Sequence, residues 1–179
     1  VQDRAALEAW VAEAVDKGVL GVDTETDSLN AAQARLVGVS LATAPGRACY
    51  VPVGHTAPGG DGALDLGGEG VPAQVALEDL IEVLAPVLAD PSVLKVGHNL
   101  KYDWQVLANH VGPTETVDDT MMISYVLDGG SHGHGLDELA DLHLGHRNIK
   151  YAEVAGSGKS MVTFDRLPLD RSRDYAAGN

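Results

Sequence analysis

The stretch VLGVDTETD at residues 19–27 decides the fold, because an apolar run passes directly into acidic residues within it. Residues 19–22 are apolar and short, and turn residues bound the run, a pattern that predicts a β-strand. Since side chains two apart on a strand point to the same face, Asp23 and Glu25 lie side by side. Adjacent carboxylates repel each other and lose hydration, which a bound cation or raised pKa values would relieve. The stretch therefore indicates either a carboxylate site or a polar strand end that leads into a turn.

Strands and helices are predicted on both sides of this stretch. Helical periodicity precedes it over residues 7–15 and ends at Gly18. Two further apolar runs, 35–41 and 47–53, are bounded by turn residues and complete a three-stranded meander. The remaining predicted elements are helices over 73–88, 99–111, 120–127 and 136–144, a short buried strand over 93–96, and a last helix that opens at Pro168. Strands followed by alternating helix and strand predict an α/β fold with a mixed sheet flanked by helices.

The 179 residues are expected to form a single domain, residues 1–179. Residues 54–72 contain seven glycines, a composition that indicates a surface loop rather than a second domain. The sequence contains no internal repeat and no linker long enough to divide the chain.

Composition excludes several classes of protein. Twelve Lys and Arg against 26 Asp and Glu give a net charge of −14, which excludes a general polyanion binder acting through bulk charge. Aromatic residues make up 4% of the chain, too few for an array of base-stacking platforms. The lone Cys49 cannot form an internal disulfide, which agrees with a reducing compartment. No apolar run approaches the roughly 18 residues of a membrane helix, and the N-terminus lacks a signal-peptide pattern. We expect a cytoplasmic protein with no membrane partner, or one whose leader has been removed.

A second acidic group comes from VGHNLKYD at residues 96–103, where a predicted strand passes into a predicted helix. Asn99 and Asp103 are four residues apart and so share one helical face, beside the apolar stripe. Sites in open α/β sheets gather where strands end and helices begin, although an acid at a helix start is also favoured by the helix dipole. Asp118 and Asp119 precede another predicted helix, and there we predict capping.

Four histidines near the glycine-rich segment HGHG raise a zinc alternative. They are His132, His134, His143 and His146. Histidine is a common zinc ligand, but residues in a glycine-rich turn more often cap helices or face solvent. We therefore expect these histidines to cap helices or to face solvent.

Five stretches of the sequence resemble those of one known protein family. They are VDTETDSLN (22–30), VGHNLKYDWQVLANHVG (96–112), DDTMMISYVLDG (118–129), LDELADLHLGH (136–146) and AGSGKSMVTFDRLPLDRSRDYAAGN (155–179). Together they resemble the 3′–5′ proofreading exonuclease domain of bacterial family A DNA polymerases and follow that family's order over most of the chain. The resemblance implies a ribonuclease H-like fold and membership of the DEDD exonucleases that carry a tyrosine in the last motif.

The resemblance also implies a role for individual residues. Asp23 would bridge two metal ions, Glu25 would bind the first ion, and Asp103 would hold the second largely through water. Tyr175 matches the tyrosine that orients the attacking water. The implied substrate-binding positions are Thr24, Leu29, against which the terminal base would pack, Asn99 and Tyr175.

The implied reaction is hydrolysis of the 3′-terminal phosphodiester of DNA, which releases nucleoside monophosphates. Its cofactors would be two divalent ions, Mg²⁺ or Mn²⁺, with Zn²⁺ possible at the first site. Two such ions carry more charge than three carboxylates, so the loaded site would attract phosphate in spite of the acidic surface. The implied partners are a single-stranded or frayed DNA 3′ end and a C-terminal polymerase domain, in the bacterial cytoplasm near the nucleoid.

The last motif departs from the family pattern. Where the family has an aspartate ligand, this chain has Asn179, preceded by Gly178 in place of an acid. An asparagine offers a carbonyl oxygen but no charge, so the first metal would be held less firmly. Two alternatives to an active DNA exonuclease follow: a degenerate module that binds DNA ends or only supports a polymerase, and a relative that acts on RNA 3′ ends.

Overall fold

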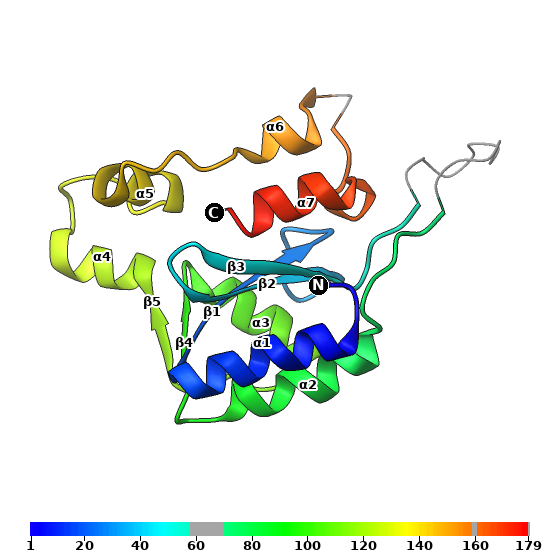
Figure 1. The fold of residues 1–179 in the computed structure, drawn as a ribbon. Coiled ribbons are helices and arrows are strands. Elements are labelled where there is room, and N and C mark those ends of the chain that lie inside the picture. The colour runs from blue at the N-terminus through cyan, green and yellow to red at the C-terminus, as the bar shows by residue number, and fades with distance from the viewer. Residues whose placement is uncertain (58–69, 159–160, 179) are drawn as a thin grey trace.

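A computed structural model describes residues 1–57, 70–158 and 161–178 (Figure 1). The strands are β1 (Val19–Thr26), β2 (Leu36–Ala44), β3 (Arg47–Pro52), β4 (Leu94–Gly97) and β5 (Val117–Asp119). The helices are α1 (Arg4–Lys17), α2 (Leu77–Ala89), α3 (Leu100–His110), α4 (Thr120–Asp128), α5 (Leu136–Leu144), α6 (Tyr151–Ala155), the 3₁₀ helix η2 (Phe164–Arg166) and α7 (Leu169–Ala176).

The five strands form one sheet in the order β3-β2-β1-β4-β5. The meander β1-β2-β3 is antiparallel, whereas β4 and β5 run parallel to β1. Gly46 closes the turn between β2 and β3 with a φ of 71°, a left-handed conformation that glycine adopts readily. The predicted mixed sheet flanked by helices is therefore confirmed, with β1 at its centre.

Strand β1 extends beyond the end of its parallel neighbour. It pairs with β2 from Gly21 to Thr26, but its ladder with β4 covers Val19 to Gly21. Strand β4 ends at Gly97, where the chain turns into α3. The acidic half of β1 therefore has one edge that β4 does not cover, and α3 begins beside that edge.

Helices cover both faces of the sheet (Figure 1). Helices α1, α2 and α3 pack on one face, and their apolar side chains join those of the sheet in the larger core. Helices α6 and α7 lie on the other face around Phe164, Tyr50 and Ala176. Strand β2 contributes to both cores, because Val39 and Leu41 belong to the first and Val37 to the second. Each catalytic candidate on β1 thus faces one of two helical layers.

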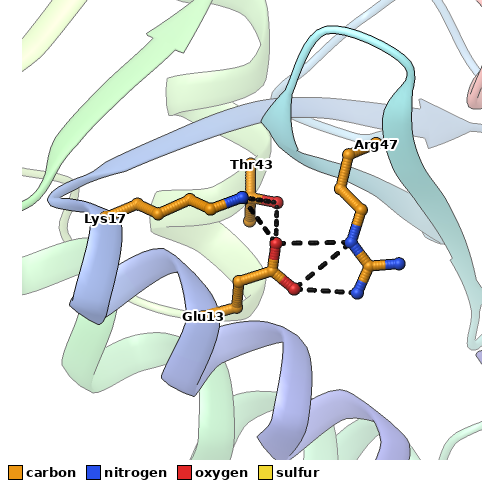
Figure 2. A network of polar contacts seen from close by, with 4 residues as sticks. All are labelled: Glu13, Lys17, Thr43 and Arg47. Atoms are coloured by element: carbon orange, nitrogen blue, oxygen red, sulfur yellow. Dashed lines mark hydrogen bonds and ion pairs between the residues drawn. The ribbon is translucent and has the colours of Figure 1, made fainter.

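A polar network fastens α1 to the β2–β3 hairpin (Figure 2). The Glu13 carboxylate contacts Arg47 Nη2 at 2.8 Å and Lys17 Nζ at 2.7 Å, and it accepts a hydrogen bond from Thr43 Oγ1 at 2.6 Å. The Arg47 guanidinium also lies 4.2 Å from the centre of the Trp10 ring. Hydrogen bonds from Arg47, Lys17 and Thr43 lower the pKa of Glu13 well below its usual range. Because the ion pairs are solvent-exposed, they fix geometry more than they stabilise the fold.

Three differences from the predicted elements have local causes. The helix expected over 73–88 begins at Leu77, because Val75 N donates to Pro52 O and continues the sheet edge instead. Strand β5 and helix α6 were not predicted, since three and five residues are too short to show a period. Of the surface loop predicted at 54–72, residues 58–69 lie outside the described residues. No helix in the described ranges is both long and apolar enough to cross a membrane.

Candidate active site

Asp23 and Glu25 lie on the face of β1 that is turned toward α7. Asp23 lines a cavity of about 220 Å³ together with Ser40 of β2 and Ala176 of α7. Glu25 stands opposite Gly38 of β2 in the register. Asp23 has much of its surface open to solvent while protein atoms surround it on most sides, as expected in the wall of a cleft. The alternation expected from the sequence is therefore realised at this strand end.

Asp103 reaches the same strand from the other helical layer. It lies in the first turn of α3 and is 3% exposed. Its Oδ1 accepts two hydrogen bonds from Thr24, one from the backbone N at 2.9 Å and one from Oγ1 at 2.6 Å. Both donors belong to the part of β1 that extends past β4. The uncovered strand edge thus joins Asp103 to the Asp23–Glu25 pair.

All three carboxyl groups have raised pKa values, and burial is the largest cause for each. Burial by surrounding protein, followed by the charge of Asp103, raises the pKa of Asp23. Burial raises the pKa of Asp103, while the hydrogen bonds from Thr24 act in the opposite direction. Burial, with the charges of Asp23 and Asp103, raises the pKa of Glu25 to about 9. Without a cation, the site therefore favours protonated carboxyls.

Tyr175 of α7 lies on the same side as Asp23 and Glu25. Burial and the charges of Glu25 and Asp23 raise the pKa of Tyr175, so its phenol stays protonated. Its ring centre lies 5.8 Å from that of Phe164 and 6.0 Å from that of Tyr151. These rings hold the Tyr175 side chain next to the carboxylates.

The turn after β1 presents Leu29 to solvent. The Ser28 carbonyl accepts hydrogen bonds from the hydroxyls of Thr26 and Tyr102, which ties the turn to α3. Leu29 itself is 98% exposed. Leu29 is therefore a large apolar side chain in water in the turn that directly follows β1, and its contact with a base stays a prediction.

Asn99 departs from the prediction that it shares a helical face with Asp103. It precedes α3 in a left-handed conformation, with φ 56° and ψ 42°, so the helix begins one residue later. The backbone N–H groups of Asn99 and Leu100 instead donate to the Asp119 carboxylate, at 3.0 and 2.9 Å. Asp119 also accepts from Met121 N, which confirms its predicted capping of α4. Asp118 does not cap, because it lies in β5 opposite Val96.

The position of Asn179 lies outside the described residues. Helix α7 ends at Ala176, followed by Ala177 as its C-cap. The role expected of Asn179 as an altered ligand position thus stays a prediction.

The four histidines of the zinc alternative do not form a ligand set. In the described ranges, no three or more His, Cys, Asp or Glu side chains are placed to hold a metal ion. His134 Nδ1 is 2.8 Å from Ser124 Oγ, and His132 Nδ1 and His146 Nε2 donate to the carbonyls of Gly133 and Gly178. These three histidines take part in hydrogen bonds with other parts of the protein, and their capping of helices stays a prediction.

The carboxylate group fits a divalent ion by its chemistry. Carboxylate oxygens are the ligands that Mg²⁺ and similar hard cations prefer, and a cation would offset the burial of all three groups and the repulsion at Asp23 and Glu25. Asp23, Glu25 and Asp103 are therefore suitable donors, although within the described part of the chain they do not yet surround one point at ligand distance.

Sequence reasoning missed Tyr50 as a neighbour of the site. Its hydroxyl lies 2.8 Å from His55 Nε2, and burial and the charge of Glu25 raise the pKa of Tyr50. The Tyr50 side chain crosses directly over Gly38, where a Cβ atom would overlap its hydroxyl. A glycine inside a predicted strand is the signal that could have indicated this close approach.

Comparison with known proteins agrees with this geometry. A family model described as 3′–5′ exonuclease matches residues 1–178. DNA polymerase I of Rhizobium leguminosarum is 46% identical over 186 residues, which cover 99% of this chain and 18% of that protein. DNA polymerase I of Pseudomonas aeruginosa is 39% identical over 180 residues, with the same coverage of 99% and 18%. The chain thus spans about 18% of the length of these relatives.

A solved structure shows the fold independently. Escherichia coli RNase D, described as an exoribonuclease involved in structured RNA processing, aligns with a TM-score of 0.62. The alignment covers 99% of this chain and 40% of that chain at 17% identity. At such identity the likeness concerns the fold alone, and it confirms the expected ribonuclease H-like architecture.

Proposed function

The chain belongs to the 3′–5′ exonuclease family found in DNA polymerase I, and from that premise we propose that it removes nucleotides from DNA 3′ ends as a proofreading domain. The observation that carries this proposal is the meeting of Asp23, Glu25 and Asp103 at the uncovered edge of β1. Three crowded carboxyl groups, each with a pKa raised mainly by burial, form a site that cations and phosphate would complete.

Asp23, Glu25 and Asp103 are the residues that would hold two divalent ions, Mg²⁺ or Mn²⁺. When bound, such ions supply a nucleophile at neutral pH and stabilise charge on the leaving 3′ oxygen. The specific metal, including Zn²⁺ at the first position, is part of the proposal.

The protein's other groups would orient the reactants. Tyr175, with its phenol protonated, would hydrogen-bond the attacking water and align it with the phosphorus. Leu29 would pack against the terminal base, supported by its full exposure beside the site. Asn99 would support the substrate strand from the start of α3.

Asn179 would attenuate this activity. The family pattern places a charged ligand there, and a neutral amide attracts the first metal less strongly. A degenerate domain that binds DNA ends or supports a polymerase is therefore the second candidate function.

DNA is the proposed substrate, and a polymerase domain the proposed C-terminal neighbour. The 46% and 39% identical relatives are named DNA polymerase I and are more than five times as long as this chain, which supports both proposals. An RNA 3′ end is the alternative substrate, supported by the likeness of fold to RNase D.

End-labelled oligonucleotides test the proposal. A 5′-labelled single-stranded DNA and an RNA of the same sequence are incubated with the chain and Mg²⁺ or Mn²⁺. We expect stepwise shortening of the DNA from its 3′ end, and its loss in the Asp103→Ala variant. Degradation of RNA but not DNA would favour the alternative substrate. Equal DNA degradation by the Asp103→Ala variant would refute the assigned site.

A further inference from the structure

We propose that Thr24 is a positioning residue that fixes Asp103, so that one carboxylate oxygen of Asp103 stays free for a divalent ion. This inference rests on the proposed function, since it concerns how a proposed metal-binding residue is held.

Both hydrogen bonds from Thr24 end on the same oxygen. The backbone N and the side-chain Oγ1 donate to Asp103 Oδ1 at 2.9 and 2.6 Å. A hydrogen bond to an ionised carboxylate is shorter and stronger than one between neutral groups. Oδ2 thus receives no hydrogen bond from Thr24, and the Asp103 carboxyl also interacts with that of Asp23, the neighbouring metal-binding candidate.

The topology explains why this strand position can hold Asp103. A backbone N–H inside a sheet normally donates to the neighbouring strand, but β4 pairs with β1 only as far as Gly21. The N–H of Thr24 is therefore not used by β4, and it donates to Asp103 of α3 instead. The hydroxyl of the same residue adds the second bond, which a residue without an oxygen at Cβ could not supply.

Burial favours action through Asp103 over direct contact with a substrate. Thr24 is 7% exposed and Asp103 is 3% exposed. Strand alternation turns the Thr24 side chain away from the face that carries Asp23 and Glu25. Thr24 therefore acts from behind the carboxylates, where outer partners of metal ligands determine ligand orientation.

The test compares the Thr24→Ser and Thr24→Ala variants, which differ only by the hydroxyl. Mn²⁺ affinity is measured on the full chain by the loss of the free Mn²⁺ signal in electron paramagnetic resonance. Thr43→Ala is the matched control, because Thr43 Oγ1 also donates to a carboxylate at 2.6 Å, on Glu13, in the network of Figure 2. Thermal unfolding verifies that each variant is folded, and Thr24→Val replaces the alanine variant if that one does not fold.

We expect Thr24→Ala to weaken Mn²⁺ binding by about 10-fold or more, the usual loss for an outer partner of a ligand. Thr24→Ser should bind close to the parent, and Thr43→Ala should match the parent. Parent-like affinity in Thr24→Ala, or equal weakening in the serine variant, would overturn the inference.

A further variant separates this inference from the proposed function. If Asp103→Asn weakens Mn²⁺ binding and Thr24→Ala does not, only the positioning role is wrong. If Asp103→Asn leaves Mn²⁺ affinity unchanged, the proposed metal role of Asp103 fails and the positioning role fails with it.

Discussion

At the scale of single residues, Glu25 makes the stability of the metal-free protein depend on pH. Burial and two neighbouring acids raise the pKa of Glu25 from 4.5 to about 9. An acid whose pKa is raised on folding stabilises the fold while it is protonated, and that contribution is lost as the pH rises through the folded-state value. The metal-free chain should therefore lose stability between about pH 4.5 and 9.

The Glu25→Gln variant isolates this effect, because glutamine resembles the protonated acid at every pH. In the presence of a chelator, we expect the parent to unfold at a lower temperature at pH 9 than at pH 6, and the variant to show a smaller difference. A contribution of about 1 kcal/mol corresponds to about 2–4 °C in a domain of this size. The check is a series of thermal unfolding curves at both pH values. Parallel pH dependence in the two proteins would contradict the charge repulsion described for Glu25.

Asn179 is the second residue with a testable consequence. Replacing it by aspartate would put a charge at the position where the resemblance implies a metal ligand. We expect Asn179→Asp to degrade single-stranded DNA about 10–100-fold faster, since losses around a metal ligand typically have that size. Labelled-DNA assays measure the rates, with Asn179→Ser, which adds no charge at the same position, for comparison. If the unaltered chain is already as fast, Asn179 does not limit the site.

At the scale of elements, one carboxylate holds the starts of two helices. Asp119 accepts hydrogen bonds from the first residues of α3 and of α4. An N-cap substitution typically costs about 0.5–2 kcal/mol, and here two helices lose a cap together.

We therefore expect Asp119→Ala to lower the free energy of unfolding by about 1–3 kcal/mol and to weaken Mn²⁺ binding, because α3 carries Asp103. Urea unfolding measures the first effect and calorimetry the second. Asp118→Ala is the control, since Asp118 is exposed in β5 and changes at such positions usually stay within about 0.5 kcal/mol. Equal effects of the two substitutions would refute the double cap.

At the scale of the whole molecule, the net charge of −14 sets how the chain meets nucleic acid. Binding through many Lys and Arg contacts to phosphate weakens steeply with salt, whereas binding through a metal-filled carboxylate site involves few such contacts. Attraction to DNA should thus be confined to the cleft around Asp23.

We expect the affinity for DNA to depend only weakly on salt concentration. In Mn²⁺, single-stranded DNA affinity should fall far less between 50 and 200 mM salt than the roughly 10³–10⁵-fold typical of proteins with 6–10 phosphate contacts. Fluorescence anisotropy of the unaltered chain with a DNA whose 3′-terminal linkage resists hydrolysis, measured in Mn²⁺ and with chelator as the control, gives both affinities. A steep salt dependence that persists in chelator would indicate a basic surface instead.

The sequence by itself determined the sheet class and the pairing of Asp23 with Glu25. Both follow from local rules, since side chains alternate along a strand and apolar runs reveal their period. The same rules predicted the helix that carries Asp103 and the cap provided by Asp119. They failed for β5, whose three residues form a strand only because β4 lies beside them.

Only the tertiary structure decided that Asp103 lies beside the strand that carries Asp23 and Glu25. The meeting depends on β4 pairing with β1 no further than Gly21, which leaves the N–H of Thr24 for Asp103. Strand register and the end of a ladder are set by long-range packing, so no local pattern around Thr24 or Asp103 could reveal them. The same holds for the second cap made by Asp119, whose partner at Asn99 lies 20 residues away. Residue types and faces are local properties of the chain, whereas the distance between residues 24 and 103 exists only in the folded sheet.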